Sequence, residues 1–222
     1  RERYHYACRN FILLGLIVER LVGRRLDDFC QETVFAPLGM TATVGHPVPP
    51  ALQARVVPGS IHAGPDLHSV VARVGRLLGH AGLFAPAGDI ARFCAMMLAG
   101  GQLGSTRILG ERALAWLTRP CSPPGLPPRT FGYDLRPGEA PAAASPEADD
   151  ARPRCPSRPQ GLSAAAYGHS GWSGQNIWID PQRQLYLIIL TNRTHGLDVM
   201  ANRGPSQRLR QRVGDIVLAH RG

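Results

Sequence analysis

The fold of this chain is decided by one stretch near its C-terminal end, Tyr167-Gly-His-Ser-Gly-Trp-Ser-Gly-Gln-Asn-Ile-Trp-Ile-Asp-Pro181. A glycine-bracketed strand is followed there by a second strand that ends in Asp-Pro, and then by a third, buried strand. The glycines would leave one strand edge free of side chains, so that another molecule could lie against the backbone. These glycines are Gly168, Gly171 and Gly174, and the strands are expected at 167–173, 175–180 and 185–192.

Segments with the 3.6-residue period of an amphipathic helix surround these strands. Gly23 follows the first of them as a helix stop signal, and Gly100-Gly101 follow the third. Helices come first, then antiparallel strands, then a closing helix that can pack on the sheet, which suits an α+β layered domain. We therefore expect a single domain over residues 1–222, an antiparallel sheet flanked by helices. The expected helices span 10–22, 26–35, 86–98, 108–117 and 205–219.

Two segments lack such a period. Residues 41–78 carry several prolines and other turn residues, and we expect a loop that lies over a surface. Residues 120–160 are rich in proline, and we expect a disordered insertion there. Within it only Phe131-Gly132-Tyr133 resembles a strand.

Composition excludes several classes of function. The net charge of +9 rests on arginine alone, since the 222 residues contain no lysine. The arginines are scattered and no basic strand is interleaved with aromatic residues, so we expect no nucleic-acid partner. The longest apolar run, Phe11–Val18, is too short to span a bilayer, so no transmembrane segment is expected.

Metal binding is not expected either. The five cysteines lie far apart, without Cys-x-x-Cys or a histidine pair at zinc-finger spacing. A site built from His62, Asp66 and His68 would fall in a proline-interrupted loop, which argues against it. We therefore expect no metal and no cofactor.

The first motif with chemical meaning precedes the first helix, Tyr4-His-Tyr-Ala-Cys-Arg-Asn-Phe-Ile-Leu-Leu-Gly15. It resembles the Tyr-x-Asn region of serine hydrolases in the class C β-lactamase, penicillin-binding-protein and esterase superfamily. Tyr6 and residues 10–15 match that region, whereas Cys8 stands where the family has Asn or Asp. The resemblance implies that Tyr6 is the proton shuttle of an active site. On the local pattern alone, a tyrosine before a helix is more often a packing or capping residue.

The second motif is Gly79-His-Ala-Gly-Leu-Phe-Ala-Pro-Ala-Gly-Asp-Ile-Ala-Arg-Phe93. It is similar to the Gly-His-Ala-Gly-Leu-Phe-Ser-Thr-Ala-x-Asp-Leu-Ala-x-Phe stretch of one branch of that superfamily. The resemblance implies that His80 lies on the rim of the cleft and binds substrate. The alternative is a loop histidine that caps a turn.

The third motif is the opening stretch itself, continued by Leu190-Thr191-Asn192-Arg193. It resembles the His-Thr-Gly or His-Ser-Gly version of the superfamily's Lys-Thr-Gly strand. The resemblance implies that His169 is a catalytic polar group beside Tyr6. Ser170 and Gly171 would then bind the carboxylate or carbonyl region of the substrate, and the N–H of Trp172 would be one oxyanion donor.

Together the three motifs imply a β-lactamase/transpeptidase-like fold and hydrolysis of an amide or ester through an acyl-enzyme. A D-alanyl peptide, a β-lactam or a small ester would be the substrate, and the cell envelope, periplasm or exterior the location. The family's nucleophile lies in a Ser-x-x-Lys motif upstream of the tyrosine, and this chain has no lysine. We therefore expect an N-terminally truncated, catalytically silent domain. The alternative is a non-catalytic remnant or interaction module that keeps the fold.

Two other nucleophiles are conceivable. Residues 168–172 nearly match the Gly-x-Ser-x-Gly elbow of α/β-hydrolases, but they fail at the fifth position and lead into a strand instead of a helix. Cys8 could act as a thiol, although a free cysteine at the start of a helix is more often a packing residue.

Overall fold

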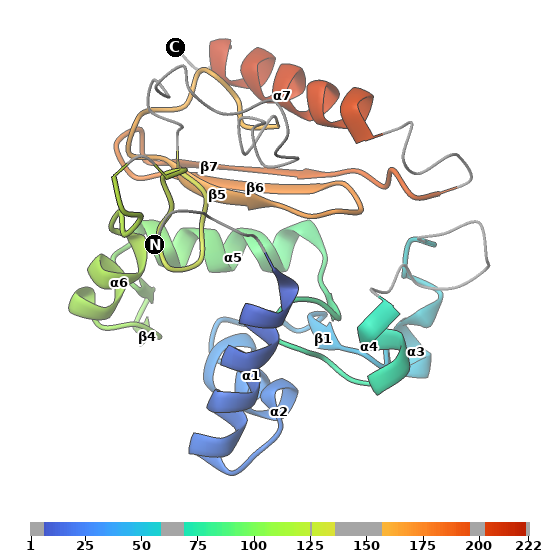
Figure 1. The fold of residues 1–222 in the computed structure, drawn as a ribbon. Helices are drawn as coiled ribbons and strands as arrows, with labels where there is room; N and C mark the ends of the chain where they lie inside the picture. Colours follow the sequence, from blue (N-terminus) through green and yellow to red (C-terminus); the bar gives the residue numbers. More distant parts are fainter. Residues whose placement is uncertain (1–6, 59–68, 125, 136–156, 196–202, 221–222) are drawn as a thin grey trace.

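The centre of the molecule is a three-stranded antiparallel sheet in the order β5–β6–β7 (Figure 1). Its strands are β5 (Tyr167–Ser170), β6 (Gln175–Asp180) and β7 (Leu185–Leu190). The three predicted strands are confirmed, although the first ends at Ser170 because the chain then turns into β6. The computed structural model describes residues 7–58, 69–124, 126–135, 157–195 and 203–220.

The predicted helices are also confirmed, within three residues at each end. The first helix ends at Val22 because Gly23 adopts φ 68°, a left-handed conformation that glycine accepts without strain. In the described residues, no helix is both long and apolar enough to cross a membrane. The helices are α1 (Cys8–Val22), α2 (Leu26–Cys30) with its π-helical continuation η1 (Gln31–Phe35), α5 (Ala87–Leu98), α6 (Glu111–Thr118) and α7 (Arg203–Ala219).

Each face of the sheet packs against a helix, because side chains alternate between the two faces of a strand. On one face, Tyr167 and Ile179 join the main core with Met97 of α5. On the other face, Trp178 packs with Leu218 of α7. The sheet therefore lies between α5 and α7, and α1 to α4 lie on the α5 side of it (Figure 1). This layering confirms the expected α+β architecture.

The prediction of a loop over 41–78 is wrong for part of that segment, which contains short regular elements. Burial of Val48 and Val71 holds them against the body of the domain, a tertiary effect that no local period reveals. The segment contains β1 (Val44–Gly45), which pairs with β2 (Leu83–Phe84), and the helices α3 (Pro50–Gln53) and α4 (Ser69–Val74). A second hairpin follows α5, formed by β3 (Gln102–Leu103) and β4 (Thr106–Arg107).

Both flanks of the proline-rich segment 120–160 belong to the fold. Residues 129–134 form a tight turn that pairs with β5, and Phe131-Gly132 is its bend instead of the expected strand. At the other flank Ser157 and Arg158 are buried. Residues 126–135 and 157–160 therefore have a defined conformation, in contrast to the predicted disorder. Residues 136–156 lie outside the described part of the chain, so the prediction stays untested there.

Candidate active site

The strand β5 uses its two edges differently. One edge pairs with β6, whereas on the other edge Gly168 and Asp134 exchange backbone hydrogen bonds of 3.1 and 2.7 Å. Backbone groups alternate along a strand, so the N–H and C=O of Ser170 point to the same outer edge as those of Gly168. The N–H of Gly171, by contrast, donates to Gln175 O on the β6 side (2.8 Å). Within the described residues the outer pairing stops at Gly168, so Ser170 lies on an edge that an extended ligand can join.

Two of the three glycines of this motif have structural reasons of their own. A Cβ on Gly168 would lie 2.6 Å from Trp178 Cε3. Gly174 adopts φ 122°, which side-chain-bearing residues rarely accept. A Cβ on Gly171 would lie 2.6 Å from Gln175 Oε1, the end of a flexible side chain that can move aside. Gly168 and Gly174 therefore admit the Trp178 ring and the β5–β6 turn, and a glycine-lined outer edge stays a prediction.

His169 lies beside the outer edge, next to a buried ion pair. Its side chain is 35% exposed, and its Nε2 is 4.0 Å from Asp134 Oδ2. Asp134 also forms an ion pair with Arg129, and both of these side chains are about 10% exposed. Burial lowers the pKa of His169 below its ordinary value, the charge of Asp134 raises it, and that of Arg129 lowers it. The imidazole therefore favours its neutral form and can act as a hydrogen-bond donor and acceptor at neutral pH.

Trp172 borders the same region in the turn between β5 and β6. Trp172 is 58% exposed, and the Arg193 guanidinium lies 4.3 Å from the centroid of its ring. Arg193 Nε also donates to the backbone carbonyl of Trp172, while its own backbone N–H donates to Ser173 O (2.9 Å). Because Arg193 follows β7, this arginine ties the turn to the end of the sheet. Trp172 is thereby held as an exposed aromatic platform beyond Ser170.

His80 lies in a tight turn next to α1. Gly79 and His80 form a tight turn between Leu78 and Ala81, and both ring nitrogens of His80 are shielded from solvent. The turn lies against α1, since a Cβ on Gly15 would lie 3.1 Å from Gly79 N. The first two sequence motifs thus meet at this glycine–glycine contact. The geometry favours the alternative of a turn histidine, and substrate binding by His80 stays a prediction.

Several candidate residues lie outside the described part of the chain, namely Tyr6, His62, Asp66 and His68. Among the residues that are described, no three His, Cys, Asp or Glu side chains are grouped so that they could hold a metal ion. Cys8 is free and half-buried at the first residue of α1.

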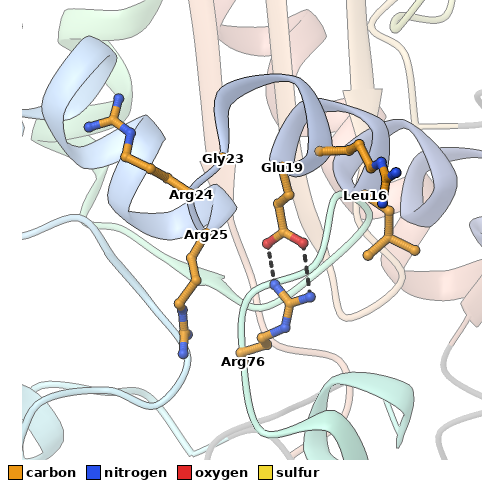
Figure 2. Close-up of a pocket in the computed structure, with 7 residues that line it drawn as sticks. Leu16, Glu19, Gly23, Arg24, Arg25 and Arg76 are labelled. Atoms are coloured by element: carbon orange, nitrogen blue, oxygen red, sulfur yellow. Dashed lines mark hydrogen bonds and ion pairs between the residues drawn. The ribbon is translucent and has the colours of Figure 1, made fainter.

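An open pocket of about 440 Å³ lies at the C-terminal end of α1 (Figure 2), and none of the residues that line it belongs to the third motif. Arginines dominate its lining, and one of them, Arg76, forms an ion pair with Glu19 inside it. It contains no Ser, Cys, His or Tyr that could act as nucleophile or base. The candidate catalytic side chain, His169, lies at the outer edge of β5 and not in this pocket.

Sequence reasoning missed Asp134, Arg129 and Arg193. The first two lie in the segment that its prolines marked as disordered, so their pairing with β5 was not expected. One signal was available, because an acidic residue directly follows the strand-like Phe131-Gly132-Tyr133. Arg193 was quoted as part of the third motif, but its position over Trp172 depends on the β6–β7 register.

Comparison with solved structures supports the fold. The structure is similar to a β-lactamase from Mycobacterium bovis, with a TM-score of 0.61 and 23% identity over 98% of this chain and 64% of that one. It is also similar to the octameric penicillin-binding protein homologue from Pyrococcus abyssi, with a TM-score of 0.62 and 18% identity. That match covers 96% of this chain and 43% of the other. A family VIII carboxylesterase matches with a TM-score of 0.54 and 19% identity, over 90% of this chain and 55% of the other.

Comparison of sequences gives relatives described as putative D-alanyl-D-alanine carboxypeptidases. A putative D-alanyl-D-alanine carboxypeptidase from Salmonella gallinarum (strain 287/91 / NCTC 13346) is 29% identical over 215 residues, which is 88% of this chain. A protein with the same description from Escherichia coli (strain K12) is 27% identical over 214 residues, or 87% of this chain. In both cases the match covers 46% of the relative, so the chain spans slightly less than half the length of these proteins. The family model described as β-lactamase matches residues 1–211, and the chain belongs to the β-lactamase family.

Proposed function

We propose that this chain supplies the substrate-binding strand and its histidine to a serine hydrolase that cleaves an amide or ester bond through an acyl-enzyme. The observation that carries the proposal is the outer edge of β5. There the pairing with Asp134 stops at Gly168, the backbone of Ser170 faces outward, and the half-exposed His169 lies alongside. A peptide-like substrate can add to this edge as a further strand.

In this proposal, Ser170 and Gly171 bind the carbonyl or carboxylate region of the substrate, and the Trp172 ring borders it. The N–H of Trp172 is one of two backbone donors that stabilise the tetrahedral oxyanion. Neutral His169 donates or accepts a hydrogen bond beside the reacting carbonyl, where Tyr6 shuttles the proton. Both residues contribute only when a nucleophile is present.

The nucleophile must come from outside these 222 residues, because the chain contains no lysine to pair with a serine. The serine Oγ would attack the carbonyl carbon, and its proton would pass through lysine and Tyr6 to the leaving group. Water would then hydrolyse the acyl-enzyme and regenerate the serine. The relatives are about twice as long as this match, which leaves room for such a motif.

The names of the relatives support a proposal for the substrate class. Proteins similar to this chain are described as a putative D-alanyl-D-alanine carboxypeptidase, a β-lactamase and a family VIII carboxylesterase. The same acyl transfer serves all three, so we propose a D-alanyl peptide, a β-lactam or a small ester as substrate.

The test uses the 222-residue chain and a longer polypeptide that includes the sequence encoded upstream of it. The chain alone should hydrolyse neither a chromogenic cephalosporin nor a short-chain nitrophenyl ester. The longer polypeptide should hydrolyse at least one of three substrates, namely these two and a D-alanyl dipeptide. Replacing the upstream serine by alanine should abolish turnover, and His169→Ala should lower kcat about 100-fold or more.

Absence of a Ser-x-x-Lys motif upstream, together with no turnover by the longer polypeptide, would overturn the proposal in favour of an interaction module. Hydrolysis by the chain alone, with an active site that can be titrated, would also overturn it, because the nucleophile would then lie within the 222 residues.

A further inference from the structure

The helix α1 is apolar on all sides over more than two turns. Residues 11–18 read Phe-Ile-Leu-Leu-Gly-Leu-Ile-Val and contain no polar side chain. A helix at the surface of a domain normally carries polar residues on its outer side, whereas a helix that is apolar all round is covered on both sides. With 15 residues, α1 is too short to span a bilayer. Its composition therefore indicates a helix that lies between two layers of protein.

One side of α1 is already packed in this structure. Gly15 is buried where the helix meets the loop after α4, since a Cβ on Gly15 would lie 3.1 Å from Gly79 N and 3.2 Å from Leu26 Cδ2. One turn further on, both oxygens of the Glu19 carboxylate accept hydrogen bonds from the Arg76 guanidinium. These contacts fix the rotation of α1 about its axis, and they therefore decide which residues point away from the domain.

The side of α1 that points away carries a continuous row of large apolar residues, which we call the α1 stripe. Its members recur at spacings of three and four, so they lie together on one face of the helix. They are Leu13, Leu14, Ile17 and Leu21, with exposed fractions of 56%, 53%, 53% and 79%. An exposed apolar face of this kind marks a surface that binds another protein segment.

Related proteins contain chain that could cover this stripe. The match with the Mycobacterium bovis β-lactamase takes in 98% of this chain but 64% of that one, so the rest of that protein has no counterpart here. The proposed function adds a position, because a nucleophile that exchanges a proton with Tyr6 must lie beside the start of α1, at Cys8. Leu13 lies only about 8 Å further along the helix axis, at a rise of about 1.5 Å per residue.

We propose that the α1 stripe is the surface on which the upstream segment that bears the nucleophile packs in the longer polypeptide. That segment would present an apolar face of its own, because the leucine and isoleucine side chains of the stripe offer no hydrogen-bonding group. Packing on the stripe would hold the nucleophile beside the start of α1, where Tyr6 precedes the helix. The inference deepens the proposed function and rests on it for the identity of the segment.

Side-chain footprinting of the longer polypeptide tests this packing without any turnover. A diazirine is photolysed with the monomeric protein, and the label on each residue is measured by mass spectrometry. Leu13 and Ile17 should carry about tenfold less label than Leu209 and Ile216 of α7, because packing removes most of their accessible area. The α7 residues are matched controls, since they are 55% and 52% exposed in the structure, against 56% and 53% for Leu13 and Ile17.

Two further measurements identify the cover. Photo-leucine incorporated into the longer polypeptide should cross-link the α1 peptide to the upstream segment of the same molecule. Leu13→Gln/Ile17→Gln should lower the midpoint of thermal unfolding of the longer polypeptide by about 5 °C or more, because two polar groups would be buried without partners. Leu209→Gln/Ile216→Gln should leave this midpoint nearly unchanged.

Equal labelling of α1 and α7 would overturn the inference. Loss of α1 labelling that appears only when the polypeptide dimerises, or only after anionic lipid vesicles are added, would also overturn it, because a second copy or a membrane surface would then be the cover. If the α1 double variant fails to fold, footprinting of the parent polypeptide still decides the matter.

The proposed function fails separately from this inference. A longer polypeptide that hydrolyses no substrate but shields the α1 stripe would refute hydrolysis and uphold the packing. An active polypeptide whose α1 stripe is labelled as strongly as α7 would uphold hydrolysis and refute the packing.

Discussion

At the scale of single residues, adjacent residues of the third motif meet two requirements, close packing at Gly168 and an accessible imidazole at His169. Gly168 must admit the ring of Trp178 on the α7 face, while its backbone bonds Asp134 on the outer edge. His169 points to the opposite face, where it reaches both solvent and a carboxylate. Alternation along β5 separates these demands, so a glycine for packing and a histidine for chemistry can be adjacent in sequence.

Gly168→Ala should destabilise the fold, because the added Cβ would lie 2.6 Å from Trp178 Cε3 and 2.7 Å from Trp178 Cδ2. Overpacking of this kind costs about 1–3 kcal/mol. Gly88→Ala is the matched control, since Gly88 lies in α5 with open space around it and alanine favours a helix by about 0.5 kcal/mol. Urea denaturation should therefore give free energies of unfolding that move in opposite directions. Equal stability of the two variants would contradict the role assigned to Gly168.

At the scale of elements, α1 is joined to the loop after α4 by a pair of contacts. Gly15 lies against Gly79, and the Glu19 carboxylate binds Arg76 as well as the backbone N–H of Leu26 (2.9 Å), as Figure 2 shows for the ion pair. The hydrogen bonds from Arg76 hold the pKa of Glu19 below its ordinary value, against the opposing effect of burial. The contact between the first two motifs therefore depends partly on one ionised carboxylate.

Glu19→Gln should lower the free energy of unfolding at neutral pH by about 1 kcal/mol. A carboxyl whose pKa is lower in the folded state contributes stability above its unfolded pKa and loses it as the pH falls through the folded value. The difference between Glu19→Gln and the parent chain should therefore shrink below about pH 4.5, the ordinary value for this group. Urea denaturation at pH 7 and pH 3 measures it.

Glu32→Gln provides the control for this prediction. Glu32 also pairs with an arginine, Arg24, but its side chain is 67% exposed, so the same substitution should change stability little. An effect of Glu19→Gln that is equal at both pH values would show that the ion pair is not its source.

At the scale of the whole molecule, two helices expose apolar stripes. On α7, the half-exposed or exposed residues Leu209, Val213, Ile216 and Val217 recur at helical spacing, on the side away from the sheet. On α1, the corresponding residues are Leu13, Leu14, Ile17 and Leu21. Exposed apolar patches of this extent promote association, so the isolated chain should bind a hydrophobic dye and self-associate.

The double variant Leu209→Gln/Ile216→Gln should reduce binding of anilinonaphthalene sulfonate and shift the chain to smaller species in analytical ultracentrifugation. Its free energy of unfolding should change little, because both side chains are already more than half exposed. Leu218→Gln, in contrast, alters a side chain that is 4% exposed in the core against the sheet, and should destabilise by several kcal/mol. A parent chain that is monodisperse and binds no dye would refute this account of the stripes.

The local sequence was sufficient to predict the main helices and strands. The periods of 3.6 and 2, together with glycine and Asp-Pro stops, located the five main helices and the three strands, because these signals act between residues close in the chain. The three motifs were likewise sufficient to identify the family. The short elements of 41–78 were not foreseen, since burial of Val71 and pairing of β1 with β2 depend on distant partners.

The sequence by itself therefore determined the helices, the antiparallel strands, the family and His169 as a candidate. Only the tertiary structure decided what surrounds that histidine. Asp134 reaches it because a turn within a proline-rich segment adds to the outer edge of β5, and Arg129 follows because the turn places it opposite Asp134. The charge of an imidazole depends on burial and on neighbours brought together by this pairing, and neither is encoded in any local pattern.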